Sequence, residues 1–106
     1  MIRATLSIKI KAGREAEFER VWRTVAERVR AEPGNIRQTL MRDPSDPADY
    51  VIASDWESRE AFTRFERSPE QDALTAPIRE LRASASMTVR EIVTHLERTD
   101  DARDVP

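Results

Sequence analysis

The stretch Tyr50–Ser68, YVIASDWESREAFTRFERS, changes from the repeat of a β-strand to that of a helix within a few residues. Alternate residues of its first half share one face of an extended segment: Tyr50, Ile52, Ser54 and Trp56. Phe62 and Phe65 then follow the spacing of a helix that starts after Ser58. A large aromatic where a strand meets a helix can line the gap between a sheet and its covering helices. Because small-molecule pockets form in such gaps, the stretch predicts a pocket beside Trp56.

A strand, a helix and a second strand are predicted before this stretch. Residues 2–10 alternate between apolar and polar side chains, which predicts a half-buried strand. Residues 14–32 repeat apolar side chains at helical spacing, and Pro33 and Gly34 end that helix. Residues 35–43 predict a second strand with weaker alternation.

The remaining strands are separated by turn-forming and helical segments. Residues 44–49 are rich in Pro and Asp and predict a turn, so residues 35–43 and 50–57 form a hairpin around a six-residue loop. Residues 84–96 alternate again and predict a long final strand. Residues 97–106 are charged and aperiodic, and predict a mobile tail.

Two helices are predicted between the third and last strands. Ser58 suits the N-cap of a short helix that extends to about Arg67. Ser68 and Pro69 suit the cap and first position of a second helix. Pro77 lies inside that second helix and predicts a kink or a break.

The order strand, helix, strand, strand, helix pair, strand predicts an α+β fold over residues 1–96. It is the ferredoxin-like split βαβ pattern, an antiparallel four-stranded sheet with helices on one face. The uncovered face would then carry Val51, Ala53 and parts of the first and last strands. Two such faces packed across a two-fold axis would cover each other, which predicts a homodimer.

Composition excludes several classes of partner. The net charge is −2 and no basic run follows any face, which argues against nucleic-acid binding. No apolar stretch reaches 18 residues and no secretory signal pattern is present, which predicts a cytoplasmic protein without a membrane partner. The sequence has no cysteine and one histidine, so neither thiolate chemistry nor a transition-metal site is expected.

The central motifs resemble the antibiotic biosynthesis monooxygenase domain, a dimeric α+β barrel. The matching features are Pro33-Gly34 after the first helix, an Asp-Pro-rich hairpin from Asp43 to Asp49, Trp56-Glu57-Ser58, and the pair Phe62 and Phe65. The resemblance implies a scaffold whose members include cofactor-free oxygenases that turn polyketide phenols into quinones. Other members degrade haem, isomerise small phosphorylated sugars or act in stress responses.

Two positions depart from the quinone-forming members of that family. There, the resemblance places an Asn four residues before the Trp and a Tyr six residues after it. Ile52 and Phe62 occupy these positions here. The haem-degrading members use an Asn and a His that fall on Leu6 and near Thr75, so haem degradation is rejected.

Eight residues are candidates for a site, each with a structural alternative. Trp56 forms either a catalytic pocket wall that stacks on a planar substrate or a plug between helix and sheet. His95 is a candidate for proton transfer because its unperturbed pKa lies near neutrality, or it is a surface histidine. The candidate substrate-binding residues either line a cavity or have structural roles, as core side chains or, for Arg90, in an ion pair. They are Tyr50, Ile52, Ser54, Phe62, Phe65 and Arg90. Tyr50 or Arg90 would hold an oxygen substituent.

No cofactor is expected. The two glycines, Gly13 and Gly34, lie at helix ends, so the sequence lacks a glycine-rich phosphate loop. An oxygenase of this kind would use an aromatic phenol as its own reductant toward dioxygen. The sequence thus favours a cofactor-independent monooxygenase acting on a polycyclic aromatic. A non-catalytic binding or accessory module, and a cyclase or isomerase, remain as alternatives.

Overall fold

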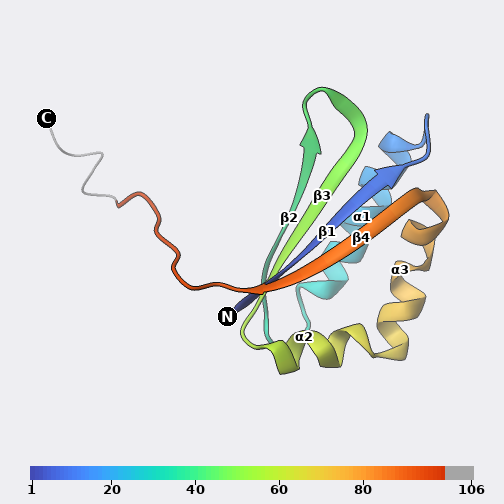
Figure 1. Cartoon of the computed structure of the whole chain (residues 1–106). Coiled ribbons are helices and arrows are strands. Elements are labelled where there is room, and N and C mark those ends of the chain that lie inside the picture. Colours follow the sequence, from blue (N-terminus) through green and yellow to red (C-terminus); the bar gives the residue numbers. More distant parts are fainter. Residues whose placement is uncertain (100–106) are drawn as a thin grey trace, which may run out of the picture.

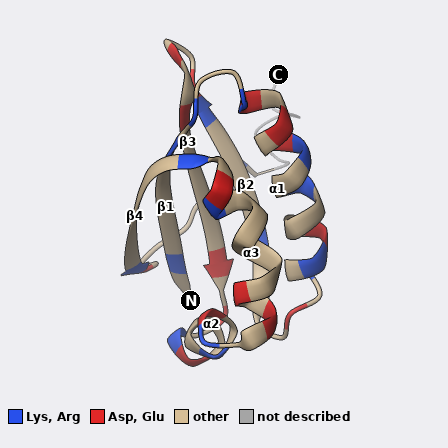
Figure 2. Cartoon of the chain, turned by 90° about the vertical axis from the view of Figure 1, so that its right-hand side faces the viewer, with Lys and Arg blue, Asp and Glu red and all other residues tan. Residues whose placement is uncertain are grey.

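The computed structural model describes residues 1–99, which form one four-stranded antiparallel sheet and three helices (Figure 1). The elements follow in this order: β1 Ile2–Ile10, α1 Glu15–Val29, β2 Asn35–Asp43, β3 Asp46–Trp56, α2 Arg59–Glu66, α3 Pro69–Leu81 and β4 Arg82–Glu91. The strand order across the sheet is β2-β3-β1-β4. This is the predicted ferredoxin-like α+β fold, and its helices cover one face of the sheet (Figure 2).

Helices α2 and α3 begin at serine residues whose side chains cap them. The Ser58 hydroxyl accepts a hydrogen bond from the Ala61 backbone N–H at the start of α2, at 3.1 Å. Ser68 does the same for Gln71 N–H at the start of α3, also at 3.1 Å, and Pro69 occupies the first turn. Both caps were predicted. They fix the positions at which α2 and α3 turn back over the sheet.

Gly34 brings the start of β2 against α2. Its φ of +90° lies in the left-handed region that favours glycine. A Cβ atom at this position would lie 2.5 Å from the Cβ of Ala61 on α2, closer than carbon atoms approach. The Glu57 N–H also donates to the Gly34 carbonyl at 2.8 Å. Glycine therefore lets the end of β3 and the start of α2 pack tightly beside β2.

The core lies between the sheet and the helices. Alternation along β1 buries one row of apolar side chains beneath the helices: Ile2, Ala4, Ile8 and Ile10. The register sets Ala4 opposite Ser54 of β3 and Val89 of β4, so these residues share the covered face. The opposite face carries the alternate residues and has no covering helix (Figure 1).

Several element boundaries differ from the predicted ones. Helix α1 ends at Val29 rather than residue 32, since the residue before Pro33 avoids the helical conformation. Strand β3 starts at Asp46, so a tight turn replaces the six-residue loop. The Asp43 carboxylate accepts from Ser45 N–H at 2.7 Å and stabilises that turn.

Strand β4 and helix α3 also correct the predictions. Strand β4 spans residues 82–91 instead of 84–96, because it pairs with β1 from Arg82 onward and that pairing ends at Glu91, opposite Ile2. Helix α3 runs unbroken through Pro77. Pro77 removes only the hydrogen bond to the carbonyl of Ala73, and both residues are exposed, so water can solvate that carbonyl.

The chain beyond β4 forms an arm, residues 92–99, that leaves the sheet on the side opposite the helices (Figure 1). Its Ile92 N–H donates to the Met1 carbonyl at 2.9 Å. Val93 and Leu96 on this arm are 92% and 88% exposed. The predicted mobile tail covers residues 97–106, of which 100–106 lie outside the described residues.

Candidate functional site

A cavity of about 210 Å³ lies between the covered face of the sheet and all three helices. Its floor comes from β1, β2 and β3 through Ala4, Gln38 and Ile52. Its walls come from the helices through apolar side chains: Trp22, Val25, Val29, Phe62, Phe65 and Ile78. The gap predicted beside Trp56 is therefore present, and it is mainly apolar.

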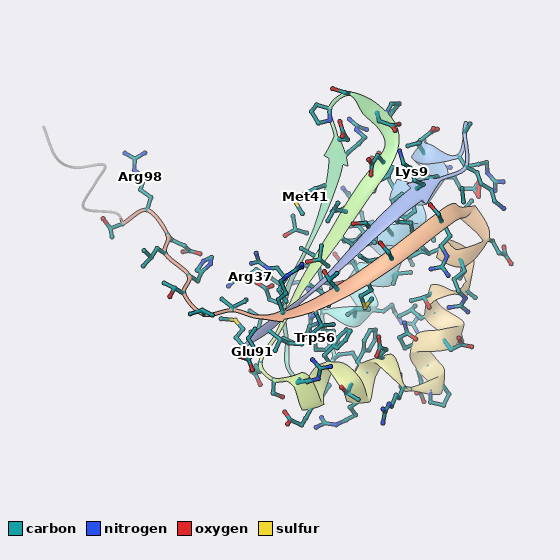
Figure 3. All side chains as sticks on the ribbon, in the orientation of Figure 1. Lys9, Arg37, Met41, Trp56, Glu91 and Arg98 are labelled. Carbon is teal, nitrogen blue, oxygen red and sulfur yellow. The ribbon has the colours of Figure 1, made fainter. Side chains whose placement is uncertain are left out.

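Trp56 ends β3 and lies between the sheet and α2, on the covered side of the sheet (Figure 3). Phe65 stacks on the indole with ring centroids 5.1 Å apart and an interplanar angle of 27°. Phe62 meets it edge-on at 5.7 Å. The two phenylalanines come from α2, whose start after Ser58 places them over the end of β3.

Trp56 is only 1% exposed, so it contributes a wall rather than an open stacking surface. One face of the indole is already covered by Phe65. The indole N–H donates to the Ser54 hydroxyl at 3.1 Å, which satisfies its one donor. The half-buried Phe65, which was expected to line the site, and Trp22, which was not, therefore offer ring surface to a guest.

A row of polar side chains on α3 faces the cavity one turn apart: Gln71, Thr75 and Arg79. The Thr75 hydroxyl donates to the Gln71 carbonyl at 2.9 Å. The Arg79 guanidinium donates to the Thr75 hydroxyl at 2.7 Å and to the Asp72 carbonyl at 2.9 Å. It also pairs with the Asp72 carboxylate at 3.3 Å, so Arg79 is held by its own helix.

Two other charged residues border the cavity. Arg82, the first residue of β4, is half-buried, and no side chain among residues 1–99 pairs with its guanidinium. Glu66, at the end of α2, is exposed and is the one carboxylate that lines the cavity in the described part of the chain. The two charges come from opposite ends of α3, since Glu66 precedes this helix and Arg82 follows it. None of the polar lining residues on α3 and β4 was predicted. The spacing of apolar residues in α3 identifies its buried face, but it does not show which polar residues border a cavity.

Five of the predicted residues meet at the cavity: Ile52, Ser54, Trp56, Phe62 and Phe65. Tyr50 does not line it. This tyrosine is buried toward the other end of the sheet, 4.8 Å from the Phe18 ring centroid, and its hydroxyl donates to Glu19 Oε2 at 2.6 Å. Loss of hydration on burial raises the pKa of Tyr50, and its bond to Glu19 raises it further. Its hydroxyl is occupied in the structure and cannot reach a guest in this cavity.

Arg90 and His95 also lie away from the cavity. Arg90 sits opposite Arg3 in the sheet register, on the uncovered face, and donates to the Thr88 hydroxyl at 2.8 Å. His95 lies beyond the end of β4 and approaches the Glu97 carboxylate at 3.1 Å. The expectation that either would act beside Trp56 is therefore not met by the geometry. Among residues 1–99, no group of three or more metal-binding side chains comes together.

The sequence profile of the family described as "Antibiotic biosynthesis monooxygenase" matches residues 1–76. The chain belongs to this family. Protein SchA of Streptomyces halstedii is 30% identical over 77 residues, which cover 73% of this chain and 20% of SchA. A 42.8 kDa protein in the whiE locus of Streptomyces coelicolor is 25% identical over 109 aligned positions, covering 99% of this chain and 26% of that protein. The chain thus spans about a quarter or less of these curated relatives.

Solved structures share the fold of this family member. SnoaB, a cofactor-independent oxygenase from Streptomyces nogalater, superposes with a TM-score of 0.82 at 24% identity, covering 92% of this chain and 97% of SnoaB. PA3566 from Pseudomonas aeruginosa gives a TM-score of 0.74 at 17% identity, covering 88% and 94% of the two chains. At these identities the likeness establishes the fold alone. No helix among residues 1–99 combines the length and apolar character needed to cross a membrane.

Two positions in the wall of this cavity are apolar where the resemblance to quinone-forming members of the antibiotic biosynthesis monooxygenase family led us to expect polar side chains. Ile52 and Phe62 stand where the quinone-forming members were expected to carry Asn and Tyr, and both line the cavity. The polar groups come instead from α3 and from Arg82 of β4. Such a site can exclude water from a flat aromatic guest and present a cation to its polar edge.

Proposed function

We propose that this family member is a cofactor-independent monooxygenase that oxidises a polycyclic aromatic phenol of the polyketide type to a quinone. The observation that carries the proposal is the cavity beside Trp56, walled by aromatic side chains and bordered by cationic ones. The family assignment supports it, as does the likeness to SnoaB, a cofactor-independent oxygenase. Similarity to a protein in the whiE locus of Streptomyces coelicolor is consistent with this assignment.

The substrate supplies all four electrons that reduce dioxygen in the proposed reaction, so no external reductant is required. A phenol or anthrone that loses a proton becomes an electron-rich anion that reacts with dioxygen. One oxygen atom forms the new carbonyl at a ring carbon. The other leaves as water with two substrate hydrogens, which are both from the CH₂ group of an anthrone, or one from the ring carbon and one from the hydroxyl of a phenol. The protein binds the ring system, favours the anion and keeps bulk water away from the reacting carbon.

The cavity volume bears on the size of the guest. An apolar cavity of roughly 150 Å³ holds one benzene molecule. At about 210 Å³, the cavity described here has room for a somewhat larger aromatic unit. We therefore expect one or two fused rings to be enclosed, while any further rings extend out of the cavity toward solvent.

An oxygen-uptake assay tests the proposed reaction. Incubation of the protein with anthrone or a naphthol in air should produce quinone absorbance, with one dioxygen consumed per quinone formed. The same mixture without dioxygen should give no quinone, and heat-denatured protein should give the buffer rate. Buffer-level rates with both substrates would contradict the proposal.

A second candidate is a non-catalytic module that holds an aromatic ligand. It is favoured by the apolar Ile52 and Phe62, which provide neither hydrogen-bond donor nor acceptor beside the guest. Saturable binding of a naphthol without oxygen uptake would identify this role. A product formed equally well without dioxygen would instead indicate a cyclase or isomerase.

We further propose that the protein acts as a homodimer that packs the uncovered sheet faces together. That face presents half-buried Val51 and Ala53 and exposed Met41, and the arm of residues 92–99 leaves the domain on the same side (Figures 1 and 3). Val93 and Leu96 on the arm are almost fully exposed. A second copy placed across a two-fold axis would cover the arm and the face of both chains.

Charges introduced on the arm should dissociate this dimer. We expect the double variant Val93→Asp, Leu96→Asp to be largely monomeric at micromolar concentration, because two carboxylates would replace apolar side chains in the interface. Sedimentation velocity measures the outcome. The matched control is Thr94→Asp, Thr99→Asp, which adds the same charge to the same arm without removing apolar side chains and should remain dimeric. A wild-type chain that is monomeric at every concentration tested would overturn the dimer.

A further inference from the structure

We propose that Arg82, supported by Arg79, forms a subsite that receives the ionised oxygen of an aromatic hydroxyl or carboxyl group at the edge of the cavity. The inference rests on the proposed aromatic-binding role and adds to it the charge state in which the guest is held. It assigns to Arg82 the anchoring role that the sequence suggested for Arg90 or Tyr50.

Within the described part of the chain, Arg82 is a cation without a counter-ion. It is half-buried where α3 ends and β4 begins, and it lines the cavity. Neither a carboxylate nor a carbonyl among residues 1–99 lies within hydrogen-bond or ion-pair distance of its guanidinium, whereas Arg79 on the same border is bonded three times. A partly desolvated guanidinium is stabilised by an anion that brings its own oxygen atoms.

Arg82 borders the same cavity as the aromatic side chains of Phe65 and Trp22. The strand side of the cavity includes Met87 of β4 and Leu6 of β1. Arg82 lies on the same strand as Met87. The aromatic wall of Phe65 and Trp22 belongs to the same cavity. A guest whose ring lies against that wall can therefore extend a polar edge toward Arg82 while its apolar part stays enclosed.

The border of the cavity carries more positive than negative charge. Arg79 and Arg82 contribute two positive charges to the cavity border, and Glu66 contributes one negative charge. The Asp72 carboxylate partly offsets Arg79 at 3.3 Å, but nothing offsets Arg82 in the described part of the chain. The site therefore favours the ionised form of a hydroxyaromatic guest, which is the form that reacts with dioxygen.

Binding of matched naphthalene ligands tests this subsite without dioxygen, so the result does not depend on turnover. Equilibrium dialysis should show 2-naphthoate bound to wild type more tightly than uncharged naphthalene. Arg82→Gln should weaken 2-naphthoate roughly tenfold, the effect of losing one charge-assisted hydrogen bond at a partly exposed site, and should leave naphthalene unchanged. Arg82→Lys should retain most of the affinity because it keeps the charge.

The absorbance of bound 2-naphthol gives a second readout that a merely structural role for Arg82 would not move. In wild type the bound naphthol should ionise at a pH about one unit lower than in Arg82→Gln, corresponding to the same tenfold preference for the anion. The matched control is Arg64→Gln, an exposed arginine of α2 that does not line this cavity and should behave as wild type. Equal binding of 2-naphthoate and equal ionisation of 2-naphthol in wild type and Arg82→Gln would overturn the subsite. Failure of all three ligands to bind wild type would overturn the aromatic-binding role as well.

Discussion

Ile52→Trp should abolish the binding of aromatic ligands while leaving the protein folded. Ile52 is half-buried on β3 and its side chain forms part of the cavity floor. An indole at this position would project into the empty space of about 210 Å³, where a guest is expected to lie. Tryptophan is well tolerated in strands, so the sheet should accommodate it. We expect affinity for 2-naphthol to fall at least tenfold, as measured by equilibrium dialysis, and oxygen uptake to fall in parallel.

The control for this substitution adds an indole elsewhere. Leu74→Trp enlarges a half-buried side chain of α3 that borders a shallow hollow between α1 and α3 and does not line the cavity. It should bind 2-naphthol as wild type does. Thermal unfolding of both variants should show that each is folded. Undiminished ligand binding by folded Ile52→Trp would show that the guest binds outside this cavity.

Asp55→Asn should destabilise the protein by about 2 kcal/mol at neutral pH. The Asp55 carboxylate is 1% exposed, on the uncovered side of β3. It accepts from Arg3 Nε at 2.7 Å and from Arg3 Nη2 at 3.0 Å, and lies 3.3 Å from Arg37 Nη1. An amide keeps the shape but not the charge. The effect is smaller than for a fully buried ion pair because both arginine side chains are about two-fifths exposed and can be rehydrated.

The effect of Asp55→Asn should depend on pH in a defined direction. The hydrogen bond from Arg3 holds the pKa of Asp55 below its ordinary value, with attraction to Arg3 and Arg37 acting in the same sense. The carboxylate therefore contributes stability above its unfolded-state pKa of about 4, and this contribution is lost as the pH falls through the lower folded-state value. Urea titrations should show a constant difference from wild type between about pH 5 and 8.

The same urea titrations in acid should show a smaller stability difference between the two proteins than at neutral pH. The difference between wild type and Asp55→Asn should shrink below about pH 4 as the wild-type carboxylate becomes protonated. Asp49→Asn is the matched control: its carboxylate is about one-third exposed and lies 3.6 Å from Lys9, so the change should cost less than about 0.5 kcal/mol. Equal stability of Asp55→Asn and wild type at neutral pH would contradict this account.

The order and type of the elements followed from local patterns in the sequence. Alternation in residues 2–10 and the change of period after Trp56 predicted β1, β3 and α2, because side-chain direction repeats every two residues in a strand and every 3.6 in a helix. The caps at Ser58 and Ser68 were also predicted, since capping is local chemistry. The boundaries of β3 and β4 were wrong because pairing with neighbouring strands decides where a strand starts and ends.

The grouping of Ile52, Ser54 and Trp56 with the aromatic pair of α2 was likewise readable from the sequence, since it depends on one strand and the helix that follows it. What only the tertiary structure decided was which other residues join them. Tyr50 shares the face of Trp56, yet it lies six residues along β3, beneath α1 and beside Phe18. Arg82 enters the cavity because α3 returns the chain to β1, a placement set by packing between elements far apart in sequence. Local periodicity fixes the direction of a side chain, whereas contacts across the sheet and helices determine what that side chain meets.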